Sequence, residues 1–215
     1  MTTFLLIRHA HVDEVGNSLA GRRDGVHLSE LGKQEARILA ERLADVPIHG
    51  IYSSPLERAL ETATPLAQRL SLRIEPAEEL IEFDFGDWTG LTFQDLDDDP
   101  RWRQFNTFRS GTRVPGGETM LEVQARAITF LQHMYKTCPD QTLLLVSHCD
   151  VIRAILCHYL GMPLDLFLRI TIDPAALSML RLHHDSATIL TMNAIAPSGL
   201  SPTHSVAPQG RHRAD

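Results

Sequence analysis

Two arginines and two histidines stand at equivalent places in the chain, each at or just after the end of an apolar segment. Arg8 and His9 end the first such segment, Arg58 follows the second, and His148 ends the fourth. Guanidinium forks match phosphate oxygens, and an imidazole with one unprotonated ring nitrogen can act as a nucleophile. These four side chains together predict phosphoryl-transfer chemistry.

Such a reaction also needs an acid that protonates the leaving oxygen. Glu82 and Asp84 are the leading candidates, because they lie where the chain enters an irregular segment, residues 80–117, that is rich in aromatic residues. The residues alone leave the choice between the two carboxyl groups open.

Alternating strands and helices are expected to position these groups. Compact apolar runs predict strands at residues 3–7, 50–53, 72–74 and 143–147, and two more near 177–183 and 188–193. Helical periodicity between them predicts an α/β fold with a mostly parallel central sheet and helices on both faces. Ligands of such sheets bind beyond the carboxyl ends of the strands, so the four side chains are expected to meet there.

Local signals place the helix ends. Ser54 is expected to cap a helix, with Pro55 at its first position and Glu57 three residues after the cap. Pro65 is expected to bend or end that helix. A further capped start is expected at residues 119–122.

The organisation predicted is one catalytic domain over residues 1–195, with the 80–117 segment as an irregular or helical insertion over the active site. Residues 196–215 are rich in Pro, Ser, Gly and His and are expected to form a flexible tail.

Composition limits the partners. The 215 residues carry a net charge of -7, which argues against nucleic acid or a membrane surface as partner. Three cysteines without a CxxC pair favour reduced thiols and a cytoplasmic location. The apolar run at the N-terminus is too short for a signal sequence or a membrane span. The oligomeric state stays open, with a homodimer as one option.

Four sequence blocks resemble the histidine phosphatase superfamily, also called phosphoglycerate mutase-like, in its order and spacing over about residues 4 to 193. The blocks are LIRH at 6–9, YSSPLERALETA at 52–63, EFDFGDWTG at 82–90 and VSHCDVIR at 146–153. The block around Glu82 resembles the phosphatase branch rather than the mutases, which carry a longer insertion there.

The resemblance implies a role for each candidate. His9 would be the phosphorylated nucleophile, and Glu82 would protonate the leaving oxygen and then activate water. Arg8, Arg58 and His148 would bind the transferring phosphoryl group. Neither a metal nor a cofactor would be needed, and the substrate would be a small phosphorylated metabolite.

The resemblance also suggests Asn17, Gly21 and Arg22 as further phosphate-binding residues. Ala10, His11, Val12 and Cys149 depart from the family pattern at the border of the pocket. As a separate guess from charge, a second anionic group of the substrate could be contacted by Arg22, Arg23, Arg109 or Arg113.

Three alternatives remain beside phosphomonoester hydrolysis. A phosphoglycerate mutase-type phosphotransferase would use the same residues. A metal-dependent hydrolase would use His9 and His11 as ligands, although Arg8 would set a fixed positive charge beside the cation. The third is a catalytically inactive protein that binds a phosphorylated ligand.

Overall fold

Six strands form one sheet in the computed structural model, which describes residues 1–13 and 18–194. Their order across the sheet is β3-β2-β4-β1-β5-β6. The strands are β1 (Thr2–Arg8), β2 (Gly50–Ser53), β3 (Ile74–Pro76), β4 (Thr142–Ser147), β5 (Leu177–Leu182) and β6 (Ala187–Ala194). The four strands β1 to β4 are parallel, whereas β5 runs antiparallel to β1 and β6 antiparallel to β5. The α/β class with a mostly parallel centre is confirmed.

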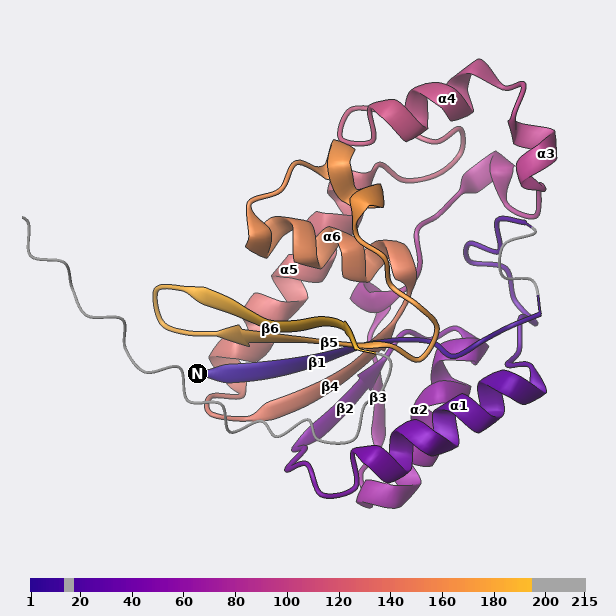
Figure 1. The fold of residues 1–215 in the computed structure, drawn as a ribbon. Helices are drawn as coiled ribbons and strands as arrows, with labels where there is room; N and C mark the ends of the chain where they lie inside the picture. The colour runs from indigo at the N-terminus through magenta and orange to yellow at the C-terminus, as the bar shows by residue number, and fades with distance from the viewer. Residues whose placement is uncertain (14–17, 195–215) are drawn as a thin grey trace, which may run out of the picture.

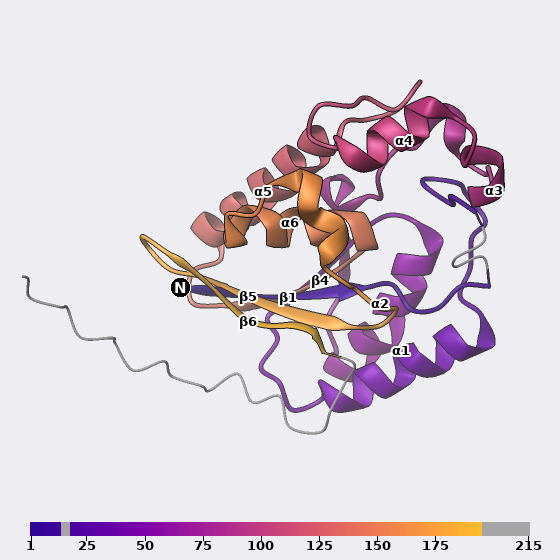
Figure 2. The same ribbon diagram turned by 45° about the horizontal axis from the view of Figure 1, so that its top comes forward.

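Helices cover both faces of the sheet, as expected (Figure 1). α1 (Glu30–Arg42) and α2 (Glu57–Leu70) lie on one face, and α5 (Met120–Thr137) and α6 (Cys149–Leu160) lie on the other (Figure 2). Successive side chains of a strand point to opposite faces, so each central strand contributes to two cores. In β1, Phe4 and Leu6 join the cluster under α5 and α6, whereas Leu5 and Ile7 join the cluster under α1 and α2.

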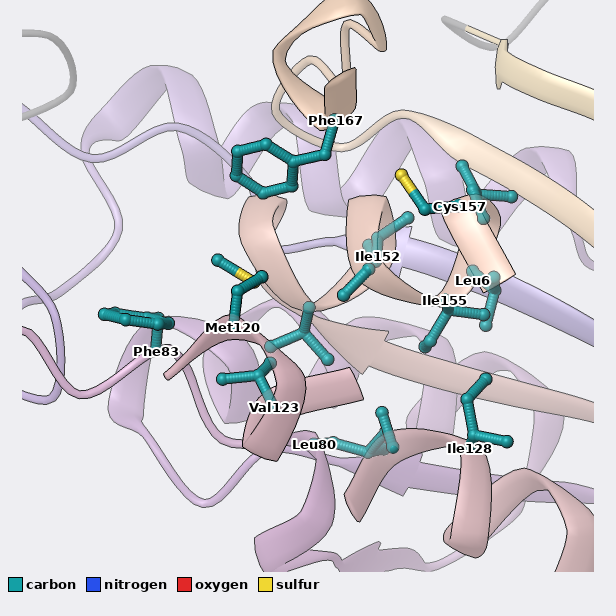
Figure 3. Close-up of a cluster of buried hydrophobic side chains, with 14 of the residues drawn as sticks. Leu6, Leu80, Phe83, Met120, Val123, Ile128, Ile152, Ile155, Cys157 and Phe167 are labelled. Atoms are coloured by element: carbon teal, nitrogen blue, oxygen red, sulfur yellow. The ribbon is translucent and has the colours of Figure 1, made fainter. Parts of the chain in front are cut away.

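The larger core connects the sheet with the base of the 80–117 segment. Figure 3 shows side chains of β1, α5 and α6 meeting in this core, among them Leu6, Ile128 and Ile155. Phe83, near the start of the 80–117 segment, and Phe167 of the 3-10 helix η3 (Leu164–Arg169) pack into the same cluster. The apolar core therefore anchors elements that also border the site described below.

The 80–117 segment contains short helices rather than strands. They are η1 (Glu78–Leu80) at its entrance, η2 (Gly86–Trp88), α3 (Phe93–Leu96) and α4 (Pro100–Thr107). α3 and α4 lie beyond the end of the sheet at which β1 finishes (Figure 1). The two ends of the segment are joined by backbone hydrogen bonds, from Asp87 N to Pro115 O at 2.9 Å and from Glu118 N to Asp84 O at 3.1 Å.

The prediction that Ser54 caps α2 is wrong, and the helix does not end at Pro65. The helix begins at Glu57 after Leu56, which makes no side-chain capping bond. The Ser54 hydroxyl accepts a hydrogen bond from Leu56 N at 3.4 Å, ahead of the helix, and is also hydrogen-bonded to His148. Pro65 lies inside the helix, which continues to Leu70. The buried face of α2 packs on the sheet, and tertiary packing of this kind stabilises a helix more than one lost backbone bond weakens it.

Other boundaries agree more closely. Thr119 and Glu122 form the capping box that opens α5. The third strand lies at 74–76, slightly later than its predicted range of 72–74. No helix in the described ranges 1–13 and 18–194 is long and apolar enough to cross a membrane. The expected tail at 196–215 lies outside the described residues.

Candidate active site

A cavity of about 330 Å³ lies beyond the carboxyl ends of the central strands. Its wall is made by side chains from β1, residues 18–21, α2, the 80–117 segment, α6 and η3. Arg8, His9, Arg58 and Glu82 all belong to this wall. Its volume is at the small end of the range for ligand pockets, so it suits a small molecule.

His9 follows the last residue of β1 and is 5% exposed. Its Nδ1 lies 2.8 Å from the carbonyl oxygen of Ala10. A carbonyl oxygen only accepts, so Nδ1 carries the proton and Nε2 has a free lone pair. Burial, and then the positive charges of Arg58 and Arg8, lower the pKa of His9 well below 6.5. The ring is therefore neutral at pH 7 and has the protonation state of a nucleophile.

His148 follows the end of β4 and is completely buried beside His9, with ring centroids 5.2 Å apart. Its Nε2 lies 2.7 Å from Oγ of Ser54, whereas its Nδ1 makes no hydrogen bond with the described part of the chain. That Nδ1 is 4.0 Å from Oε2 of Glu82. Burial and the charge of Arg58 lower the pKa of His148, so this ring is also neutral at pH 7. If the Ser54 hydroxyl donates to Nε2, Nδ1 carries a proton that it can donate to a ligand.

Arg8 and Arg58 each have one donor that is not used within the described part of the chain. Arg8 donates from Nη1 to Ile172 O at 2.6 Å, and Arg58 donates from Nη2 to Gly21 O at 2.7 Å. Arg8 Nε and Arg58 Nη1 are buried and make no hydrogen bond among the residues that the structure describes. A buried donor without a partner costs on the order of 1–3 kcal/mol. Together with His148 Nδ1, these atoms form an incomplete set of donors that a tetrahedral anion would complete.

Glu82 supplies the carboxyl group of the cavity wall. Burial, and then the charge of Asp150, raise the pKa of Glu82 to about 7, so both of its protonation states are accessible near neutrality. Its Oε1 accepts a hydrogen bond from Phe83 N at 2.8 Å. Asp84 is not part of the wall, and its Oδ1 accepts from Gly86 N at 2.9 Å. The geometry favours Glu82 where the sequence left the two carboxyl groups open.

The other residues predicted to bind phosphate differ in whether they lie in the cavity wall. Gly21 lies in the cavity wall, and its carbonyl oxygen orients Arg58. Arg22 is not in the wall, because its guanidinium donates from Nε to Glu82 O at 2.9 Å and pairs through Nη2 with Glu118 at 2.8 Å. It therefore supports the backbone that carries the Glu82 carboxyl. Asn17 lies outside the described residues.

Of the four arginines considered for a second anion, only Arg109 lines the cavity. Arg113 is exposed and pairs with Glu122, and Arg23 is also absent from the wall.

Two of the residues that depart from the family pattern, His11 and Cys149, have defined surroundings in the structure. His11 Nδ1 lies 2.8 Å from Ser29 Oγ, whereas His9 Nδ1 faces the Ala10 carbonyl, so the two rings have separate partners. In residues 1–13 and 18–194, no three His, Cys, Asp or Glu side chains are grouped so that they could hold a metal ion.

Cys149 lines the cavity, and burial raises the pKa of its thiol to about 12, so the thiol stays protonated.

Sequence reasoning missed several residues of the site. The sequence predicts Ser54 as a helix cap and does not select Asp150, Arg153 or Asn106, yet the last three line the cavity. Asp150 lies in the first turn of the helix after His148 and Arg153 three residues further on. The argument that selected Arg58, a charged residue in the first turn after a strand end, also applies to Asp150.

The chain is similar to known proteins in sequence and in fold. The family model of the histidine phosphatase superfamily (branch 1) matches residues 4–195. The chain is similar to phosphoserine phosphatase 1 of Hydrogenobacter thermophilus, with 31% identity over 201 residues, covering 90% of this chain and 92% of the relative. It is also similar to glucosyl-3-phosphoglycerate phosphatase of Mycobacterium tuberculosis, with 32% identity over 169 residues and coverage of 74% and 75%. The solved structure of a mycobacterial glucosyl-3-phosphoglycerate phosphatase superposes with a TM-score of 0.81 at 28% identity, covering 89% of this chain and 98% of that one.

Proposed function

This chain belongs to the histidine phosphatase superfamily (branch 1), and from that membership we propose how its residues hydrolyse a phosphomonoester. The enzyme is a phosphatase, as the sequence predicts. One observation carries the assignment of roles. A neutral histidine with a free Nε2 shares the cavity with buried cationic donors that make no hydrogen bond with the described residues.

In the first step, Nε2 of His9 attacks the phosphorus atom and the bond from phosphorus to the ester oxygen breaks. Glu82, in its protonated form, gives its proton to that oxygen, so a neutral alcohol leaves. Arg8, Arg58 and His148 donate hydrogen bonds to the phosphoryl oxygens, which neutralises charge where it is spread in the transition state. The product is phosphohistidine and ionised Glu82.

In the second step, Glu82 accepts a proton from a water molecule, whose oxygen attacks the phosphorus. The bond from phosphorus to Nε2 breaks, inorganic phosphate forms, and both His9 and Glu82 regain their starting states. A pKa of about 7 for Glu82 suits both roles, because the group must give a proton and then take one. Neither of the two proposed steps uses a metal ion.

The substrate we propose is a small phosphorylated metabolite. The similar proteins are named for phosphoserine and glucosyl-3-phosphoglycerate, and the cavity of about 330 Å³ fits molecules of modest size. We further propose residues 1–195 as a single catalytic domain, with the 80–117 segment as a cap that contributes Glu82 and several wall residues.

The test is phosphate release from a panel of phosphomonoesters in excess EDTA, with wild type and His9→Ala measured side by side. We expect hydrolysis that persists in EDTA and is lost in the variant, with the fold of the variant checked by circular dichroism. Activity that disappears in EDTA and returns with zinc or manganese would contradict the mechanism. Substantial activity in folded His9→Ala would remove His9 as nucleophile.

A further inference from the structure

Arg109 is a buried arginine in the cavity wall that the proposed phosphoryl chemistry does not use. It lies just after α4 and is 5% exposed. Its guanidinium carbon is 4.2 Å from the ring centroid of Phe105 and 4.3 Å from that of Phe167. Two aromatic rings contact this group and limit its movement, which fixes its orientation in the cavity.

The hydrogen bonds of Arg109 are incomplete. Nη2 donates to Oδ1 of Asn106 at 2.6 Å, and Asn106 in turn donates to Trp102 O at 2.9 Å. Nε and Nη1 of Arg109 are buried and form no hydrogen bond with the residues that the structure describes. The carboxylate of Asp150 is 3.9 Å from Nη1, which is too long for a hydrogen bond.

A purely structural role explains this arrangement poorly. An apolar side chain could fill the space beside Phe105 and Phe167 without the cost of burying a charged group with unused donors. Burial lowers the pKa of Arg109 only to about 10, so the group keeps its charge at neutral pH. A charged, oriented donor in a ligand-sized cavity is the arrangement expected of a site that binds an anion.

The charges around Arg109 indicate what kind of anion fits. Asp150 is shared with Arg153, whose Nη1 lies 3.3 Å from Asp150 Oδ1. Two guanidinium groups and one carboxylate leave one net positive charge, which matches a singly charged group better than a second phosphate dianion. Phe93, Trp102 and Leu168 belong to the same cavity wall and offer apolar contact for a short carbon skeleton.

We propose that Arg109 binds a carboxylate of the substrate, so that the preferred substrates are phosphorylated carboxylic acids. The inference rests on the proposed function, because it assigns the second end of a molecule whose phosphoryl group is bound by Arg8, Arg58 and His148. A site built to hydrogen-bond a polar group discriminates strongly against an analogue that lacks it, since its buried donors are then left unpaired.

Matched pairs of phosphomonoesters test the proposal in the wild-type enzyme. Suitable pairs are 3-phosphoglycerate with glycerol 3-phosphate, phosphoserine with phosphoethanolamine, and 4-carboxyphenyl phosphate with phenyl phosphate. We expect kcat/KM to be about 10- to 100-fold higher for the carboxylate member of at least one pair, the size of one or two charge-assisted hydrogen bonds. Hydrolysis of phenyl phosphate tests the proposed phosphatase function separately, because this substrate carries no carboxylate.

Variants then assign the preference to its residue. Arg109→Gln should reduce the ratio of kcat/KM between the two members of each pair to about 1, and Arg109→Lys should keep part of the preference. Arg103→Gln is the matched control, since Arg103 is an exposed arginine of the neighbouring helix outside the cavity wall. It should leave both members of each pair unchanged.

Three outcomes would overturn the inference, and they differ in what they say about the proposed function. If wild type hydrolyses phenyl phosphate but shows no carboxylate preference in any pair, Arg109 does not bind a carboxylate and the phosphatase mechanism stands. The same holds if folded Arg109→Gln keeps the full preference. If wild type hydrolyses no phosphomonoester, the proposed function fails and the inference fails with it.

Discussion

The rings of His9 and His148 lie with their centroids 5.2 Å apart and their planes inclined by 58°. They reach this distance because β1 and β4 are parallel neighbours in which Arg8 is opposite Ser147. His9 N also donates to Ser147 O at 2.8 Å, which ties the two strand ends together. A shift of one residue in this register would turn one histidine to the other face of the sheet. The register of the two central strands therefore determines how the proposed nucleophile faces the proposed phosphate ligand.

Changing Glu82 to Gln should reveal the proton donor. We expect kcat/KM to fall by about 10²- to 10⁴-fold for an alkyl phosphate, whose leaving group needs a proton. The loss should be much smaller for p-nitrophenyl phosphate, whose leaving group is stable as an anion. Asp84→Asn is the control and should lose little on either substrate, since Asp84 is outside the cavity wall. Equal losses on both substrates in Glu82→Gln would assign the acid role to another group.

The pH dependence of kcat/KM should show the same carboxyl group. The pKa of Glu82 is raised to about 7, so its proton is lost as pH rises through that value. For an alkyl phosphate, wild-type kcat/KM should therefore decline above about pH 7. The lowered pKa of His9 keeps the nucleophile neutral across this range, so His9 adds no alkaline limb. The decline should be absent in Glu82→Gln, and an unchanged alkaline limb in that variant would contradict the assignment.

Binding of inorganic phosphate should stabilise the protein through Arg58. A ligand that binds only the folded state stabilises it by about 2.7 kcal/mol at a hundredfold excess over Kd. Wild type should therefore show a Tm that rises with phosphate concentration, measured by scanning fluorimetry. Arg58→Met should lose this rise, because Arg58 Nη1 is a buried donor that has no hydrogen-bond partner in the described part of the chain. Arg103→Met should keep it, and a full phosphate response in folded Arg58→Met would contradict the site.

Gly86 should be required for closing the base of the 80–117 segment. It has a φ of +46°, and a Cβ there would lie 2.2 Å from Pro115 O. Gly25 has a φ of +73°, and no atom of residues 1–13 and 18–194 is within 4 Å of its Cβ position. Gly25→Ala should cost only the left-handed backbone penalty, about 1–2 kcal/mol, and Gly86→Ala should cost about 1–3 kcal/mol more. Urea unfolding measures both, and equal losses would show that the 80–117 segment tolerates movement at this point.

The fold and the meeting of the main side chains could be predicted because both depend on local signals. A buried parallel strand is a short apolar run, and the residue after it lies at the edge where ligands bind. This reasoning places Arg8, His9 and His148 at one edge, and the first helical turn after β2 adds Arg58.

Contacts between distant segments could not be predicted in the same way. Ser54 has the sequence signature of a helix cap, yet its hydroxyl is hydrogen-bonded to His148, which comes from another strand end. The sequence offers four arginines that could contact a second anionic group. The contact between Arg109 and Phe167 depends on how η3 packs, which the sequence does not show. The choice of Glu82 over Asp84 likewise depends on which carboxyl group faces the cavity, a matter of backbone direction in an irregular segment.

Trapping the phosphoenzyme tests the central claim most directly. Wild type, Glu82→Gln and His9→Ala would be mixed with p-nitrophenyl phosphate, quenched in alkaline denaturant to preserve phosphohistidine, and mapped by peptide mass spectrometry. We predict a single phosphoryl group on His9, more of it in Glu82→Gln because hydrolysis of the intermediate is slowed, and none in His9→Ala. A phosphoryl group on another residue, or turnover without any phosphoenzyme in either His9-containing protein, would contradict the mechanism.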